Sequence, residues 1–169
     1  MSSARELTCL GIGLAAGALL VRALSKRTTL TLQPPTRLFK LATAAEVAKF
    51  EASGKISSQL DTADGFVHLS DRTSPRKVAA LFFAGAQDLF LLELDARSLA
   101  GPIHWIAGVM GDTPPSAPVL AAAKTTVHYL VSDGCVHVYG SAGVSMGAVV
   151  RRAPIPLGAD GVHVFPEWL

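Results

Sequence analysis

The stretch "DTADGFVHLSD", Asp61–Asp71, is the part of the sequence on which the interpretation of the whole chain depends. It places His68 inside an apolar run, with acidic and small polar residues on both sides. A run of this kind, bounded by Gly65 and Asp71, predicts a strand over residues 65–70. A histidine within it is either a hydrogen-bonded core residue or part of a functional site, and the stretch alone is compatible with both.

A second stretch, "CVHVYG" at residues 135–140, repeats the pattern. Side chains two positions apart share one face of a strand, so His137 lies beside Tyr139, as His68 lies beside Ser70. Imidazoles, a hydroxyl and a phenol suit the hydroxyls of a ribose or a phosphate. The two strands therefore predict a polar wall of a ligand pocket, although the same groups could instead satisfy one another in a polar seam.

From these patterns, His68 and His137 are the candidate catalytic residues. Ser70, Tyr139 and Asp64 are the candidate ligand-binding residues. Ser70, His137 and Asp64 could be drawn as a nucleophilic triad, but no Gly-x-Ser-x-Gly elbow precedes a helix. The histidines include no close His-x-His pair and no Cys pair accompanies them, so we predict no metal site.

Composition and charge restrict the classes of function. The 169 residues are 50% hydrophobic and 17% charged, which is typical of one folded domain. The formal net charge is +2, but residues 1–29 carry more than all of it and the remainder is slightly acidic. A basic face for nucleic acid is therefore not predicted.

The N-terminal segment, residues 1–29, is apolar over Leu7–Val21 and basic immediately afterwards. We expect residues 7–24 to form a short apolar helix that anchors the protein in a membrane, with the domain on the cytosolic side. The mitochondrial outer membrane is one candidate location. A cleaved secretory signal and a mitochondrial presequence remain alternatives. A linker at residues 30–36 then leads into the domain, residues 37–169.

Within the domain, the pattern predicts strands, two helices, and then a run of strands, which is an α+β fold of mixed, mostly antiparallel small sheets. A capping box begins one helix at Ala44, and Ser74-Pro75 begins another that runs to about residue 84, with Val78, Leu81 and Phe82 facing inward. The strands are expected at residues 37–41, 65–70, 88–96, 102–106, 126–131, 135–140 and 148–153, with a further one at 161–165.

At the motifs already quoted, together with "LFKLATAAEVAKFEASG" and "LFLLELDA", the chain resembles the domain of unknown function 952 family over residues 37–152. That family is distantly similar to the ADP-ribosyltransferase-like superfamily, whose members bind NAD in a cleft between two small sheets. The resemblance implies such a fold and a nucleotide-type cleft. The chain departs from the family pattern at Trp105-Ile106, where a Trp-Glu pair is usual, so an acid is absent there.

Together, these observations predict a membrane-anchored domain with a cleft for NAD or an ADP-ribose-like ligand, with glycosyl or ADP-ribosyl transfer as the implied reaction. The alternative is a non-catalytic, membrane-tethered binding or interaction domain that lacks the acid. A metal-dependent hydrolase built on the histidines is a third hypothesis.

Overall fold

A computed structural model of the chain describes residues 33–169. The predicted N-terminal segment and its anchor at residues 7–24 lie outside the described residues, so membrane attachment stays a prediction from the sequence. Within residues 33–169, no helix has both the length and the apolar character needed to cross a membrane.

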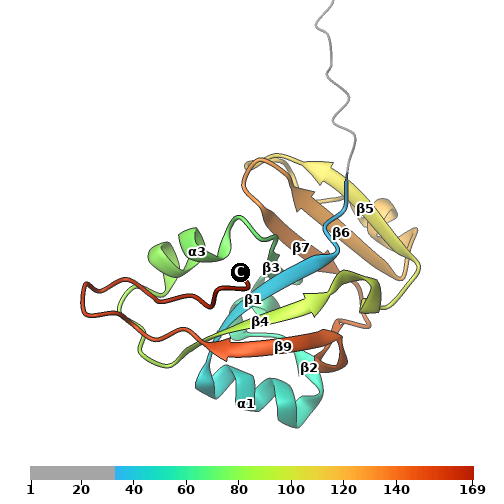
Figure 1. The fold of residues 1–169 in the computed structure, drawn as a ribbon. Helices are drawn as coiled ribbons and strands as arrows, with labels where there is room; N and C mark the ends of the chain where they lie inside the picture. Colours follow the sequence, from blue (N-terminus) through green and yellow to red (C-terminus); the bar gives the residue numbers. More distant parts are fainter. Residues whose placement is uncertain (1–32) are drawn as a thin grey trace, which may run out of the picture. The chain divides into compact units, whose positions relative to one another are not determined.

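A seven-stranded sheet, in the order β5-β6-β7-β3-β1-β4-β9, organises the domain, and β2 and β8 form a separate two-stranded sheet (Figure 1). Neighbouring strands are antiparallel throughout the large sheet except for the parallel pair β5 and β6. The strands are β1 (Arg37–Thr43), β2 (Lys55–Ile56), β3 (Val67–Ser70), β4 (Leu89–Asp95), β5 (Ile103–Gly108), β6 (Thr125–Leu130), β7 (Cys135–Tyr139), β8 (Val144–Ser145) and β9 (Val149–Pro154).

The α+β class and the mostly antiparallel pairing are confirmed, but two details of the prediction are wrong. One large sheet replaces the expected small sheets. The described chain also has four α-helices where two were expected: α1 (Ala44–Ser53), α2 (Gln59–Asp64), α3 (Pro75–Phe82) and α4 (Ala117–Ala121). The unexpected helices, α2 and α4, are short, so neither can display the repeating apolar pattern by which helices are found in a sequence.

Helix α1 begins where the sequence predicts. The Thr43 hydroxyl accepts from the Glu46 backbone NH, and the Glu46 carboxylate accepts from the Thr43 backbone NH, which completes the capping box. Gly54 then ends the helix at φ +68°, a conformation that glycine adopts without strain. The inner face of α1 buries Val47 and Phe50 in the core.

The core has two parts. The larger cluster buries alternate side chains of β3 and β7 with those of β1, β4 and α1. The smaller cluster packs α3 and the C-terminal residues against other side chains of β1 and β4, and it includes Phe39, Leu91 and Leu169. Because side chains alternate along a strand, Val67 and Leu69 of β3 enter the larger cluster, and His68 and Ser70 point to the other face.

The large sheet is held together least at its centre. The full length of β1 pairs with β4, but β1 pairs with β3 through the single register position Phe39–Ser70. The strands β5-β6-β7-β3 and β1-β4-β9 are therefore two half-sheets that diverge on either side of this one pair. Away from this pair, the half-sheets are not joined by ladder hydrogen bonds between β1 and β3 in the described chain, and space opens between them.

The strand expected at residues 88–96 is β4, an interior strand of the large sheet in which Leu89, Leu91 and Leu94 are buried. Leu81 and Phe82 of α3 are predicted to face inward, but the structure shows the opposite, because they are 63% and 75% exposed.

The last predicted strand is wrong as well. Residues 161–165 do not form a strand, and His163 makes only an isolated bridge with Leu157. Gly161 has a φ of +78°, which places a turn at the start of the segment. The apolar alternation that follows it therefore has no neighbouring strand along which to pair.

Candidate functional site

Three histidines lie side by side across neighbouring strands. His68 of β3 is directly opposite His137 of β7, and His137 is directly opposite His128 of β6. The ring centroids are 5.2 Å apart for His68 and His137, and 6.4 Å apart for His128 and His137. Antiparallel pairing puts opposite residues on one face of the sheet, so the row is a direct result of the strand register.

Phe66 packs against this row. Its ring centroid is 4.5 Å from that of His68, 4.4 Å from that of His137 and 4.9 Å from that of Tyr139. The tilted arrangement is typical of favourable contacts between aromatic rings. Phe66 therefore helps to fix the positions of the two candidate catalytic histidines, a role that the sequence analysis did not assign to it.

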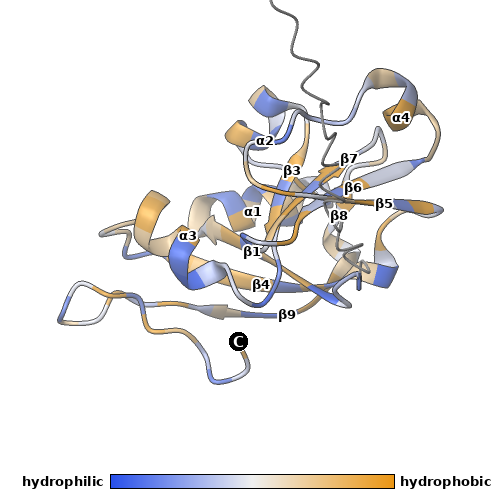
Figure 2. Ribbon diagram, turned by 90° about the horizontal axis from the view of Figure 1, so that it is seen from above, coloured by the Kyte–Doolittle hydropathy of each residue, from blue (hydrophilic) through white to orange (hydrophobic). Residues whose placement is uncertain are grey.

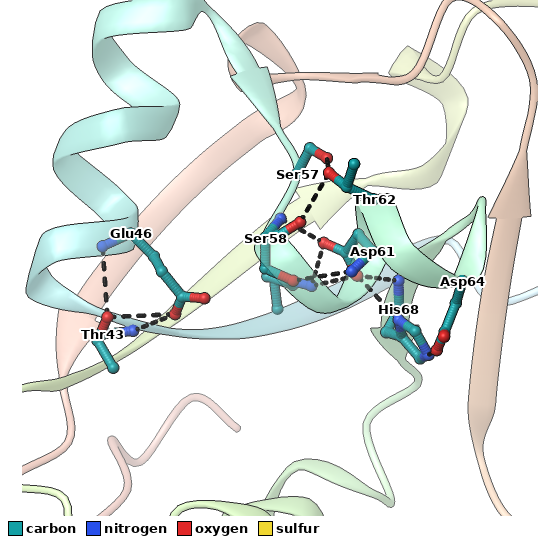
Figure 3. Close-up of polar contacts among 9 residues, drawn as sticks. Thr43, Glu46, Ser57, Ser58, Asp61, Thr62, Asp64 and His68 are labelled. Atoms are coloured by element: carbon teal, nitrogen blue, oxygen red, sulfur yellow. Dashed lines mark hydrogen bonds and ion pairs between the residues drawn. The ribbon is translucent and has the colours of Figure 1, made fainter.

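A buried carboxylate holds His68 in place (Figure 3). Asp61 is 3% exposed, and its Oδ1 lies 2.8 Å from Nδ1 of His68 and accepts the His68 backbone NH at 2.9 Å. The Lys40 ammonium donates to the Asp61 carboxylate at 2.7 and 3.0 Å, and the Ser58 backbone NH donates to it at 2.7 Å. Both oxygens of this carboxylate are thus occupied by more than one donor.

The charge of the Asp61 carboxylate determines which ring nitrogen of His68 carries the proton that faces it. Burial by itself would raise the pKa of Asp61, but the hydrogen bond from His68 and the charge of Lys40 lower it well below its ordinary value. An ionised carboxylate only accepts hydrogen bonds, so Nδ1 of His68 carries the proton that points at Asp61. The other nitrogen, Nε2, is left to interact elsewhere.

Asp61 and Lys40 are candidate functional residues that the sequence analysis missed. A signal for Asp61 was present, because Ser58 and Asp61 form a capping box at the start of α2, with the Asp61 backbone NH donating to the Ser58 hydroxyl. Lys40 had no comparable signal. It lies in a strand between two core residues, Phe39 and Leu41, where a lysine becomes explicable only once its partner is in place.

A cavity of about 600 Å³ opens where the two half-sheets diverge, bounded by β1, β3, β7, α1, α2 and α3. Its polar lining consists of Lys40, Glu46, Ser58, His68, Ser70, Cys135 and His137. Its apolar lining consists of Phe39, Leu41, Leu60, Leu69, Val78, Phe82 and Phe83. Polar groups gathered among largely apolar walls are typical of small-molecule sites.

Of the five predicted site residues, His68, Ser70 and His137 line this cavity together. Tyr139 and Asp64 do not line it. Tyr139 is buried against Phe66, and burial together with the charge of Asp64 raises the pKa of its hydroxyl. Asp64 is partly exposed, and its Oδ2 lies 3.3 Å from Nε2 of His68. Both residues therefore border the site without forming its wall.

Protonation of His137 is suppressed by its surroundings. Burial, with the nearby His68 and His128 adding to it, lowers the pKa of His137 to about 4 from its ordinary 6.5. The ring is consequently neutral at pH 7 and can both donate and accept a hydrogen bond.

We expect an NMR titration of the His137 ring to give a pKa near 4, well below its ordinary 6.5. The pKa of His137 is lower in the folded than in the unfolded protein. Protonation of His137 should therefore lower the free energy of unfolding progressively as the pH falls from 6.5 towards 4. A His137→Gln variant should lose that part of the pH dependence in urea unfolding. A His137 ring that titrates near 6.5 would contradict the buried environment described above.

A second cavity, of about 350 Å³, lies at the other end of the gap between β1 and β3 and shares Phe39 with the first. The Tyr129 hydroxyl donates there to Asp71 at 2.7 Å. Burial and this hydrogen bond raise the pKa of Tyr129 to about 12, so the phenol stays protonated. The acidic and basic side chains that line it, Arg37, Asp71, Arg72 and Glu93, balance one another.

In the part of the chain that the structure describes, no group of three or more His, Cys, Asp or Glu side chains is arranged to hold a metal ion. Although three histidines form a row, a β-ladder spreads neighbouring rings along the sheet and does not point them at one centre.

The part of the chain that forms this cavity matches a protein family. A family model described as "Protein of unknown function (DUF952)" matches residues 41–152, and the chain belongs to this family. The match includes every strand and helix that lines the cavity except the first residues of β1.

Among solved structures, the chain is similar to the protein CC0527 from Caulobacter crescentus. Its crystal structure is 28% identical in sequence, has a TM-score of 0.55, and the alignment covers 76% of this chain and 94% of that one. The crystal structure of a double mutant of CC0527 gives the same values. Among curated proteins, none matches the chain.

Proposed function

We propose that the 600 Å³ cavity binds the nucleoside part of a nucleotide-type ligand; NAD and ADP-ribose, which the sequence predicts, and adenosine are the compounds to test. The observation that carries this proposal is that His68, Ser70 and His137, which come from two strands far apart in the sequence, line one cavity with apolar walls. Sites for small molecules have volumes of roughly 300–1,000 Å³, and the volume of this cavity is within that range.

The lining suits the two halves of a nucleoside. The rings of Phe39, Phe82 and Phe83 offer apolar surface for a flat heterocyclic base. The imidazoles of His68 and His137 and the Ser70 hydroxyl offer hydrogen-bonding groups for ribose hydroxyls or for an amide on the base. The neutral ones, the His137 imidazole and the Ser70 hydroxyl, bind hydroxyls without the large desolvation cost that a buried free charge would bring.

His68 is the residue that could transfer a proton to or from the ligand. Asp61 fixes the proton on Nδ1, so Nε2 can act as a base towards a ligand hydroxyl once Asp64, which is partly exposed, moves aside. Transfer of an ADP-ribosyl group has less support than binding. The Glu46 carboxylate of the lining already accepts the Thr43 backbone NH, and the Asp61 carboxylate, which holds His68, is already bound by Lys40.

Calorimetric titration of the purified full-length chain with NAD, ADP-ribose and adenosine tests the proposal. We expect at least one of them to bind, and His68→Ala to weaken its binding by about tenfold through the loss of one well-placed hydrogen bond. His104→Ala is the matched control, because His104 is an exposed histidine of β5 outside the cavity lining. The absence of heat with all three compounds on a folded sample would contradict the proposal, as would equal effects of the two substitutions.

A further inference from the structure

The charged residues of the cavity are already paired. Within residues 33–169, Lys40 is the only lysine or arginine that lines the cavity, and its ammonium is bound to Asp61 at 2.7 Å. Glu46 is the acidic residue among the described lining residues, and it accepts the Thr43 backbone NH at 2.9 Å. A diphosphate placed inside would therefore meet no free cation of the described lining and would face the negative charge of Glu46. Its desolvation would not be repaid by any ionic contact.

The histidines do not change this balance. His137 is neutral at pH 7, because burial lowers its pKa to about 4. His68 has the Asp61 carboxylate at one ring nitrogen and the Asp64 carboxylate 3.3 Å from the other. The environment that a ligand would meet at this end of the cavity is rich in hydrogen-bonding groups but offers no net positive charge for phosphates.

The outer part of the cavity is apolar and incompletely covered. Leu60 of α2 and Phe82 of α3 belong to its lining, yet they are 58% and 75% exposed. Figure 2 shows hydrophobic colouring over the C-terminal part of α3, in contrast to the hydrophilic start of that helix. Large apolar side chains that line a cavity and remain exposed offer surface whose burial by a ligand is favourable, at about 25 cal/mol per Å².

We infer that the ligand of this cavity is a nucleoside, or a nucleoside-like aromatic heterocycle, that carries an uncharged apolar substituent instead of a diphosphate. The substituent lies between Leu60 and Phe82, and the hydroxyl-bearing part of the ligand faces His68 and Ser70. This inference rests on the proposed function and narrows it, because it places dinucleotides such as NAD below neutral nucleosides in affinity.

Two sets of probes test the inference with the full-length chain. The first set compares adenosine, adenosine diphosphate, and an adenosine whose 5′-hydroxyl is replaced by a butylthio group. The second uses the uncharged apolar dye N-phenylnaphthylamine. The dye reports on the apolar outer part of the cavity, at Leu60 and Phe82, whether or not any nucleoside binds. Each is measured on the wild type, Leu60→Ser, Phe82→Ser, and the control Leu81→Ser. Leu81 is 63% exposed on the same helix but is not part of the cavity lining.

The butylthio nucleoside should bind at least about tenfold more tightly than adenosine diphosphate. Leu60→Ser and Phe82→Ser should each weaken the butylthio nucleoside and the dye by about tenfold, and Leu81→Ser should change neither appreciably. Tighter binding of adenosine diphosphate would overturn the inference while leaving the proposed function intact. Dye binding that is unaffected by both lining substitutions would overturn the inference independently of any nucleoside. If no nucleoside binds, the proposed function fails and the inference about the ligand fails with it, even where the dye still reports the apolar outer part of the cavity.

Discussion

Replacing Asp61 with asparagine is expected to lower the free energy of unfolding by about 3–5 kcal/mol. The asparagine has the shape of the original side chain but leaves the Lys40 ammonium without a counter-charge in a site where its side chain is 7% exposed. It also weakens the acceptor that receives the His68 backbone NH and Nδ1. Removing one partner of a buried pair costs more than the pair contributes, because the remaining charge stays desolvated.

Urea unfolding at pH 7 measures this loss, and Asp64→Asn is the matched control. Asp64 also contacts His68, but its side chain is 41% exposed, so its replacement should cost less than about 1 kcal/mol. Equal losses for the two variants would show that Asp61 is not a structural centre of the site. Chemical shifts of the His68 ring nitrogens should show the proton on Nδ1 in the wild type and a changed distribution in Asp61→Asn.

The same substitution has a defined pH dependence. The pKa of Asp61 lies well below its ordinary 3.8 in the folded protein, so the stability it contributes is fully present above that value. It is lost as the pH falls through the lower, folded pKa. The difference in stability between the wild type and Asp61→Asn should therefore be constant above about pH 5 and shrink below about pH 4.

Replacing Gly140 with alanine should have the second-largest effect, a loss of about 2–4 kcal/mol. Gly140 follows β7 at φ +142°, a conformation that other residues rarely adopt. A Cβ there would lie 2.5 Å from the Lys124 carbonyl oxygen and 3.4 Å from the Cα of Thr125. Both atoms belong to the backbone at the start of β6, so no side chain can rotate away and the strand itself would have to shift.

Gly143→Ala provides the control for Gly140→Ala in the same urea unfolding measurement. Gly143 also has a positive φ, +64°, but a Cβ there would meet no atom within 4 Å. The substitution should therefore cost only the conformational penalty, about 1–2 kcal/mol. A cost for Gly140→Ala no greater than for Gly143→Ala would show that β6 is free to move at this point. The His128–His137 register should be disturbed by the first substitution only, which NMR shifts of both rings would report.

Much of the fold could be predicted because its signals are local. The capping box at Thr43 and Glu46 and the apolar run of β4 each depend on neighbours within a few positions along the chain. The predictions that failed include Leu81 and Phe82 of α3, whose apolar character resembles that of core residues although they remain exposed. Apolarity in a sequence does not distinguish a core side chain from an apolar side chain at the surface.

The candidate site was predicted in part for the same reason. Alternation along a strand put His68 beside Ser70 and His137 beside Tyr139, and the register of β3 with β7 then aligned His68 and His137. Asp61 and Lys40 could not be combined in the same way. They are 21 positions apart and meet only because α2 brings the carboxylate back over β1.

The α+β class, most of the strands, and the faces on which the two histidine motifs lie follow from local patterns, since helix caps and strand alternation are set by residues close together in the chain. The single pair Phe39–Ser70 that joins β1 to β3, the cavity beside it, and the network of Lys40, Asp61 and His68 at its edge come from the three-dimensional packing. These features depend on contacts between distant segments, whose partners and distances are fixed by packing and not by any local pattern.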